Sequence, residues 1–110
     1  MSKTCDFFLE KGSEFLATVH LVGVNNQDLP VEDCRFFCFA QNLMNEKENI
    51  KIECLTERAY QGEIVLYMPA CETIKLSSGI WEYNLDMVFE ENRRIRILLG
   101  HLNVMEDIKR

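Results

Sequence analysis

Two cysteines four residues apart come closest to a reactive motif in this sequence. Cys34 and Cys38 form a CxxxC spacing, which could belong to a metal site or a redox centre. If RFFCFAQ (35–41) is a strand, a four-residue separation along it is ~13 Å, which is too long for a disulfide. No second cysteine pair or nearby histidine completes a zinc site. We therefore interpret both cysteines as small buried hydrophobic residues and expect no metal.

The two histidines, His20 and His101, are the candidates for a general base. Nucleophilic catalysis needs such a base beside a serine or cysteine, and neither histidine stands in an elbow or triad motif. An enzyme would need one of them beside a reactive thiol in a pocket made by the fold. Glu90 and Glu91 are typical of a solvated turn. The sequence also lacks a phosphate loop, so we expect no catalytic residues, no cofactor and no small-molecule substrate.

Composition indicates one folded domain over residues 1–110, with 47% hydrophobic and 27% charged residues. The net charge of −6 disfavours nucleic acid as a ligand and favours other proteins as partners. Apolar stretches are shorter than the ~20 residues of a membrane span, and the start MSKTCD lacks a signal-peptide core. Five cysteines, an odd number, suggest reduced thiols. We expect synthesis in a cytoplasm and no contact with a membrane.

Alternating apolar and polar residues make up most of the chain, which is the pattern of half-buried strands. The segments between the alternating stretches carry Gly, Asn, Asp and Pro, which favour turns. One stretch after Pro69 is expected to form a single helical turn near residues 70–76, with Ile74 or Leu76 packed beneath the sheets. The prediction is an all-β sandwich of about seven strands, over residues 5–10, 15–22, 35–41, 50–54, 63–68, 81–90 and 94–104.

The segment RFFCFAQ has large apolar residues on both of its faces. Phe36 begins one face, and Phe37 and Phe39 share the other. Such a strand is either covered on both sides or leaves a patch for a partner. We expect burial within the domain. Phe37, Phe39 and Tyr67 are nevertheless the candidate protein contacts.

The last two strands are expected to form a hairpin around a turn at residues 91–93. Pairing residue 90 with residue 94 sets Met87 opposite Ile97 and Leu85 opposite Leu99, and puts Phe89 opposite Ile95. In this register, Leu102 and Val104 lie on the opposite face of the hairpin from Trp81 and Tyr83. One face of the first strand holds Trp81, Tyr83, Leu85, Met87 and Phe89.

An inserted residue would restore the alternation, and Gly100-His101 is where a β-bulge could supply it. With that bulge, Tyr83 faces Leu102 and Trp81 faces Val104. Gly100 is then a structural residue, and His101 lies at the bulge or on the surface. A regular ladder through residue 100 would contradict this prediction.

The segment from Pro69 to Arg110 resembles a family of small phage virion proteins with an immunoglobulin-like β-sandwich, related to modules that attach baseplate and fibre components. A weaker match begins at KGSEFLATVHL and includes LPVEDC. The family's pattern is a proline, a threonine four residues on, a leucine, a glycine and an aromatic residue, a Tyr-x-Leu strand, and Leu-Leu-x-Gly before a final valine. Here those positions are similar to Pro69, Thr73, Leu76, Gly79, Trp81, Tyr83, Leu85, Leu98, Leu99, Gly100 and Val104.

The resemblance implies structural service in a virus particle, with other virion proteins as partners in several copies. It carries no active site, because the matching positions serve packing, turns and pairing. The structural residues are expected to be Gly79, Trp81, Tyr83, Leu99, Gly100 and Val104. The chain would be a tail, baseplate or neck adaptor, or a head decoration protein. The alternative is a phage-encoded acidic inhibitor of a host defence or metabolic protein, for which small size and negative charge are also suitable.

Overall fold

The computed structural model describes residues 3–21, 34–89 and 93–106. The expected loop before Cys34, the tip of the last hairpin and the final DIKR lie outside these ranges. The short helix α1 covers Ala70–Thr73, and a 3₁₀ turn covers Ala59–Gln61. The strands are β1 (Lys3–Thr4), β2 (Phe7–Glu10), β3 (Phe15–His20), β4 (Arg35–Asn42), β5 (Asn45–Leu55), β6 (Glu63–Met68), β7 (Gly79–Phe89) and β8 (Arg93–Met105).

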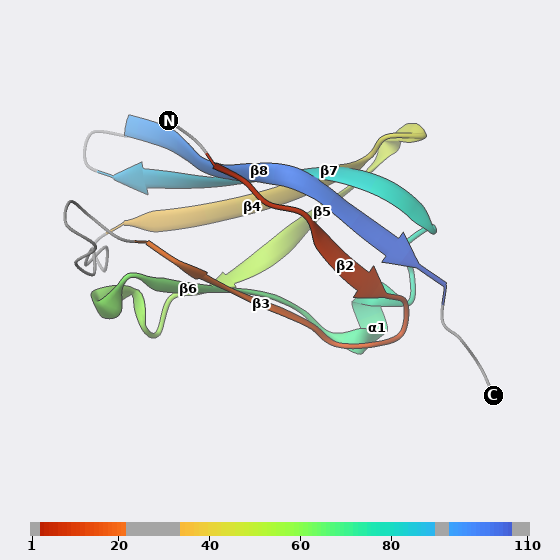
Figure 1. Ribbon diagram of the computed structural model, residues 1–110, viewed down its shortest axis with the longest axis horizontal. Helices are drawn as coiled ribbons and strands as arrows, with labels where there is room; N and C mark the ends of the chain where they lie inside the picture. Colours follow the sequence, from red (N-terminus) through yellow and green to blue (C-terminus); the bar gives the residue numbers. More distant parts are fainter. Residues whose placement is uncertain (1–2, 22–33, 90–92, 107–110) are drawn as a thin grey trace.

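The strands form two packed layers (Figure 1). In the first layer β8 pairs with β7, β7 with β4, and β4 with the first part of β5, all antiparallel. Both β1 and β2 lie on the other side of β8 and run parallel to it. The second layer contains β3, β6 and the end of β5. The prediction of an all-β sandwich is confirmed.

Strand β5 belongs to both layers. Its residues Asn49–Ile52 pair with β4, whereas Glu53–Leu55 pair with β6. In Figure 1, β5 runs diagonally from the first layer to the second.

The order of the strands is that of an immunoglobulin-like sandwich. One immunoglobulin sheet contains strands B, E and D, and the other contains C, F and G. Here β3, β6 and the end of β5 take the first set of positions, and β4, β7 and β8 take the second. The immunoglobulin-like fold expected from the resemblance is therefore present.

One hydrophobic cluster fills the space between the layers. Alternate residues of each strand point into it, as the period of a strand requires. Trp81, Tyr83 and Leu85 are at most 1% exposed. The other strand residues that are at most 2% exposed include Leu9, Cys38, Ala40, Ile52, Ile64, Leu66, Met68 and Leu102.

The predicted bulge at Gly100-His101 is wrong, because the ladder through residue 100 is regular. Tyr83 pairs with Gly100 and Trp81 with Leu102. One residue is inserted nearer the hairpin tip, at Ile97. The alternation correctly requires an extra residue in β8. The reason for glycine at position 100 is a different one, and it lies in the segment between β1 and β2.

The expected register is also wrong at the tip. Met87 pairs with Ile95 and not Ile97, while Leu85 pairs with Leu98 and not Leu99. Phe89 pairs with Arg93 and not with Ile95, which places Arg93 in strand β8.

The helical turn near residues 70–76 is confirmed. Leu76 is buried and Ile74 is half exposed, so Leu76 is the residue that packs beneath the sheets. Thr73 is fully buried and fastens α1 to the turn before β3. Its hydroxyl accepts a hydrogen bond from the Gly12 amide at 3.0 Å and lies 2.8 Å from the Ser13 carbonyl, to which it can donate.

Candidate protein-binding surfaces

The three candidate contacts lie on two different layers. Phe37 and Phe39 project from the outer face of β4, whereas Tyr67 lies on the outer face of β6. Phe39 is 41% exposed, so the expectation that this strand is covered on both faces is wrong for Phe39. Tyr67 is half-buried, and its hydroxyl donates a 3.1 Å hydrogen bond to Glu14. This bond raises the pKa of Tyr67, since it stabilises the protonated phenol.

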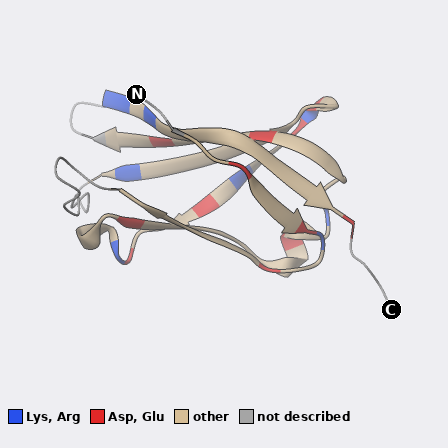
Figure 2. Ribbon diagram, viewed as in Figure 1, with Lys and Arg blue, Asp and Glu red and all other residues tan. Residues whose placement is uncertain are grey.

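Phe37 lies between two cations. The Nζ of Lys51 is 5.7 Å from the ring centroid, and the guanidinium of Arg94 is 5.6 Å from it. Opposite Phe37 in the ladder is Asp86, whose carboxylate is nearly buried and is 3.3 Å from Arg94 and 3.1 Å from Arg96. Figure 2 marks Lys and Arg residues near the starts of β4 and β8. These charge contacts hold Phe37 within the surface of the first layer.

Phe39 lies beside a shallow hollow on the same outer face. The hollow is about 300 Å³ in volume and includes Gln41, Asn49, Glu82 and Asn84 in its lining. Four of its six lining residues are polar, and they lie beside one exposed aromatic ring. This mixture is suited to a protein contact, since aromatic side chains and satisfied polar groups are common in interfaces.

A larger apolar surface lies at one end of this face. Phe8 and Ile80 both pair with Asn103, and the Leu43 amide donates to the Ile80 carbonyl. Phe8, Ile80 and Leu43 therefore lie in one row that runs from β2 through Asn103 of β8 to β7 and to the residue after β4. We call the following set of exposed residues the end patch: Phe8 (69% exposed), Leu43 (47%), Met44 (88%), Ile80 (48%) and Met105 (45%).

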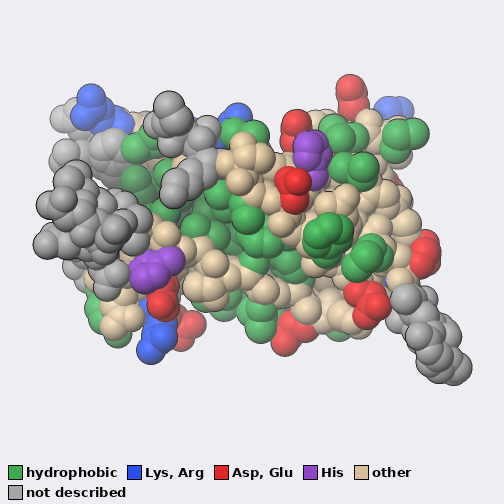
Figure 3. Space-filling view, in the orientation of Figure 1, with side chains coloured by type: hydrophobic (Ala, Val, Ile, Leu, Met, Phe, Trp, Pro, Cys, Tyr) green, Lys and Arg blue, Asp and Glu red, His purple; other side chains and the backbone are tan. Residues whose placement is uncertain are grey.

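The end patch was not found from the sequence. Phe8 stands beside another phenylalanine, and Ile80 precedes the buried Trp81, so the sequence pattern assigns each only to an ordinary strand. Phe8 and Ile80 share a row because the strands that carry them, β2 and β7, both pair with β8. In Figure 3, hydrophobic side chains reach the surface over the ends of β2 and β8 and at the nearby end of the molecule. Several exposed large apolar side chains gathered at one end of a domain are a candidate interaction site.

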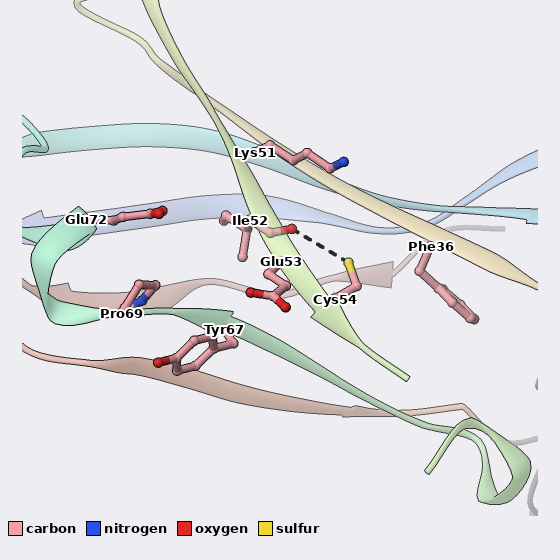
Figure 4. A pocket seen from close by; sticks show the side chains of 8 residues that line it. All are labelled: Phe36, Lys51, Ile52, Glu53, Cys54, Tyr67, Pro69 and Glu72. Atoms are coloured by element: carbon pink, nitrogen blue, oxygen red, sulfur yellow. Dashed lines mark hydrogen bonds between the residues drawn. The ribbon is translucent and has the colours of Figure 1, made fainter. Parts of the chain in front are cut away.

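A hollow larger than the one beside Phe39 lies beside β5. Its volume is about 410 Å³, and Figure 4 shows the side chains around it. Phe36 and Ile52 are buried at its base, while Tyr67 and Glu72 lie on the side of β6 and α1. Tyr67 is the candidate contact that reaches this hollow.

The thiols of Cys38 and Cys54 are held in their protonated form. Burial raises the pKa of Cys38 far above its usual range and that of Cys54 to about 11. A thiolate is the nucleophilic form of cysteine, so these two are poor nucleophiles at neutral pH. All five cysteines are free thiols, and Cys71 is exposed.

Neither His20 nor His101 is among the residues that line the hollow beside Phe39 or the hollow beside β5. The backbone amide of His101 donates to Asp6, and its ring lies 3.6 Å from the same carboxylate. Over residues 3–21, 34–89 and 93–106, no group of three His, Cys, Asp or Glu residues is placed to hold a metal ion. None of the helices in this part of the chain is long and apolar enough to cross a membrane.

The residues that carry the phage resemblance have clear packing positions. Gly100 lies under the Cys5 carbonyl, 2.0 Å from where a Cβ would stand, so no larger residue fits. Gly79 has a φ of +132°, a conformation that favours glycine. The Trp81 indole donates to the Ser77 carbonyl at 3.0 Å. Val104 is buried, and Leu99 is half-buried and accepts from the Cys5 amide at 2.9 Å.

Comparison with known proteins gives structural similarity only. No protein-family model and no curated protein matches this chain. The Lin-41 filamin domain matches with 14% identity and a TM-score of 0.48, over 88% of this chain and 81% of that one. The extracellular domain of the voltage-gated sodium channel beta4 subunit, whose parallel homodimers are described as explaining its role in cell-cell adhesion, matches with 11% identity and a TM-score of 0.45. That match covers 98% of this chain and 96% of the other. The immunoglobulin-like assignment rests on the strand order described above.

Proposed function

We propose that this domain is a protein-binding structural module of a bacteriophage particle. In this role it is a tail, baseplate or neck adaptor, or a head decoration protein, that holds neighbouring virion proteins. Several copies act in one particle.

The end patch is the observation that carries the binding role. Its five large apolar side chains are between 45% and 88% exposed, and they belong to neighbouring strands and to the turn after β4. Covering such side chains with a partner removes apolar surface from water, which contributes about 25 cal/mol per Å². Two of the five are methionines, whose flexible side chains adapt to the shape of a partner.

The virion setting is supported by the resemblance in the last 42 residues. Those positions serve packing and turns in the fold, as expected for a family that shares a scaffold and not an active site. The excess of acidic residues also suits contacts with proteins better than contacts with packaged DNA.

The test is mass spectrometry, with copy number, of particles purified from the phage that carries this sequence. We expect the protein at fixed stoichiometry, with a low count for a tail ring and a high count for head decoration. Absence from purified particles would refute the virion role and favour the inhibitor, for which pull-downs from infected cells would identify the target.

A second test separates the end patch from the rest of the surface. Changing Phe8 and Ile80 to serine should abolish incorporation into particles while leaving the thermal unfolding temperature close to that of the wild type, since both side chains are about half exposed or more. Tyr60→Ser is the matched control, because Tyr60 is 52% exposed outside the end patch. Normal incorporation of the double variant would show that the end patch is not the contact.

A further inference from the structure

A groove follows the free edge of strand β5. It consists of the 410 Å³ hollow described above and a second hollow of about 350 Å³. Glu72 lines both hollows, so the two are neighbours along one wall. The second hollow also touches Lys75, Leu76 and Trp81.

The opposite wall is an unbroken run of β5. Lys47, Glu48, Asn49 and Ile50 line the second hollow, and Lys51, Ile52, Glu53 and Cys54 line the first. Successive side chains of a strand point to opposite faces. A hollow that touched only one face would therefore meet every second residue. Eight successive residues of β5 line the two hollows. The groove therefore runs along the edge of the strand, where its main-chain N–H and C=O groups are accessible.

The main chain at this edge has no strand partner among the described residues. Asn49–Ile52 pair with β4 on one side, and β6 pairs with β5 only from Glu53 onward. Half of the N–H and C=O groups of a strand point to each side. Such an edge is able to pair with an added strand.

The side chains around the groove define the residues that such a strand would carry. Leu76 and Trp81 are 5% and 1% exposed and give one hollow an apolar base. The other hollow is lined by the exposed carboxylates Glu53 and Glu72 and by Lys51, whose Nζ lies over the Phe37 ring at 5.7 Å. Neither carboxylate takes part in an ion pair within the described residues.

We propose that the groove binds an extended segment of another protein, which adds a strand to β5 between Asn49 and Ile52. An apolar side chain of that segment enters above Leu76 and Trp81. A lysine or arginine an even number of residues away, on the same face of the segment, pairs with Glu53 and Glu72. This inference deepens the proposed protein-binding function but uses a surface separate from the end patch.

A displayed library of random ten-residue peptides supplies the probe. Selection on the intact protein should enrich peptides with an apolar residue and a basic residue separated by an even number of positions. Amide hydrogen exchange is then measured by NMR with the enriched peptide in synthetic form. Binding should slow exchange at two of the four amides of Asn49–Ile52, because alternate N–H groups face the groove.

Charge reversal provides the second measurement. Glu53→Lys combined with Glu72→Lys should weaken binding of the enriched peptide by roughly tenfold or more, because like charges then meet. Glu57→Lys combined with Glu82→Lys makes the same change in net charge on two other exposed carboxylates, and should leave binding within about twofold of the wild type.

The proposal is overturned if no enriched peptide depends on Glu53 and Glu72, or if the bound peptide leaves exchange at Asn49–Ile52 unchanged. It is also overturned if sedimentation reveals a dimer of this chain that the Glu53/Glu72 double variant dissociates, since a second copy would then fill the groove. Particle incorporation of the end-patch variant tests only the proposed function. The proposed function and the strand-addition proposal can therefore fail separately.

Discussion

The hydroxyl of Tyr83 donates a 2.5 Å hydrogen bond to the main-chain carbonyl of Cys5, although 78 residues separate them in the chain. The Tyr83 side chain is 1% exposed and crosses the core beside its ladder partner Gly100. This bond fastens the N-terminal segment between β1 and β2 to the centre of the first layer. Burial raises the pKa of Tyr83 well above its usual range, so the phenol keeps the proton that it donates.

Tyr83→Phe should lower the free energy of unfolding by about 1–3 kcal/mol, the range for leaving a buried polar group without its partner. Urea denaturation followed by fluorescence measures this difference. Tyr60→Phe is the control, because Tyr60 is 52% exposed and its hydroxyl can be solvated. Equal stability of the two variants would mean that the bond to Cys5 contributes little.

Gly100→Ala should destabilise the domain and loosen β1 from β8. The added Cβ would stand 2.0 Å from the Cys5 oxygen, so the segment must move, at a cost of about 1–3 kcal/mol or more. Hydrogen exchange at the Cys5 amide reports the movement, because that amide donates to the Leu99 carbonyl. An unchanged exchange rate at Cys5 in a stable variant would contradict the close contact.

Thr73→Val should cost about 1–3 kcal/mol, because it keeps the shape of the side chain but removes the hydroxyl that serves Gly12 and Ser13. Thr73→Ser keeps the hydroxyl, and should be the more stable variant of the two. Thermal unfolding of both variants gives the comparison. If the serine variant were the less stable, the methyl group and not the hydrogen bonds would be the important part of Thr73.

Stability should fall at alkaline pH because of the buried thiols. The pKa of Cys54 is 9.0 in the unfolded chain and about 11 in the fold, where burial disfavours the thiolate. The contribution is therefore fully present below pH 9 and is lost as the pH rises toward 11. Cys38 acts in the same direction and continues to higher pH.

Urea midpoints measured from pH 7 to pH 11 test this dependence. Replacing Cys38 and Cys54 by alanine should flatten the decline above pH 9, whereas Cys71→Ala, at an exposed thiol, should leave it in place. An identical decline in all three proteins would assign the effect to other groups.

The positions of the strands could be predicted because alternation is a local property. From Trp81 to Leu85 every second residue is buried, as the pattern predicts, whereas Asp86 is buried as well, in contact with Arg94 and Arg96. The purpose of Gly100 could not be predicted in the same way, because the carbonyl that requires a glycine belongs to Cys5 at the other end of the chain. The sequence pattern therefore points to the nearest glycine as the place of the bulge, whereas the inserted residue is Ile97.

The binding surfaces depend even more on contacts between distant segments. Phe8 and Ile80 form a row only because β2 and β7 both flank Asn103 of β8. The groove exists because β5 changes layer after Ile52, and no residue in that strand marks the change. Phe39 and Tyr67 were chosen for their residue type. Their contact role stays a prediction, although Phe39 is exposed and Tyr67 reaches the groove.

The parallel pairing of β1 and β2 with β8 determines how the domain would carry a mechanical load. The chain enters β1 at one end of the sandwich and leaves β8 at the other (Figure 1). Tension applied to these two strands in opposite directions would shear their ladders, so the hydrogen bonds would bear the force together and not break one after another. A module of this kind resists stretching along its long axis and yields more readily to a pull that peels the β7–β8 hairpin.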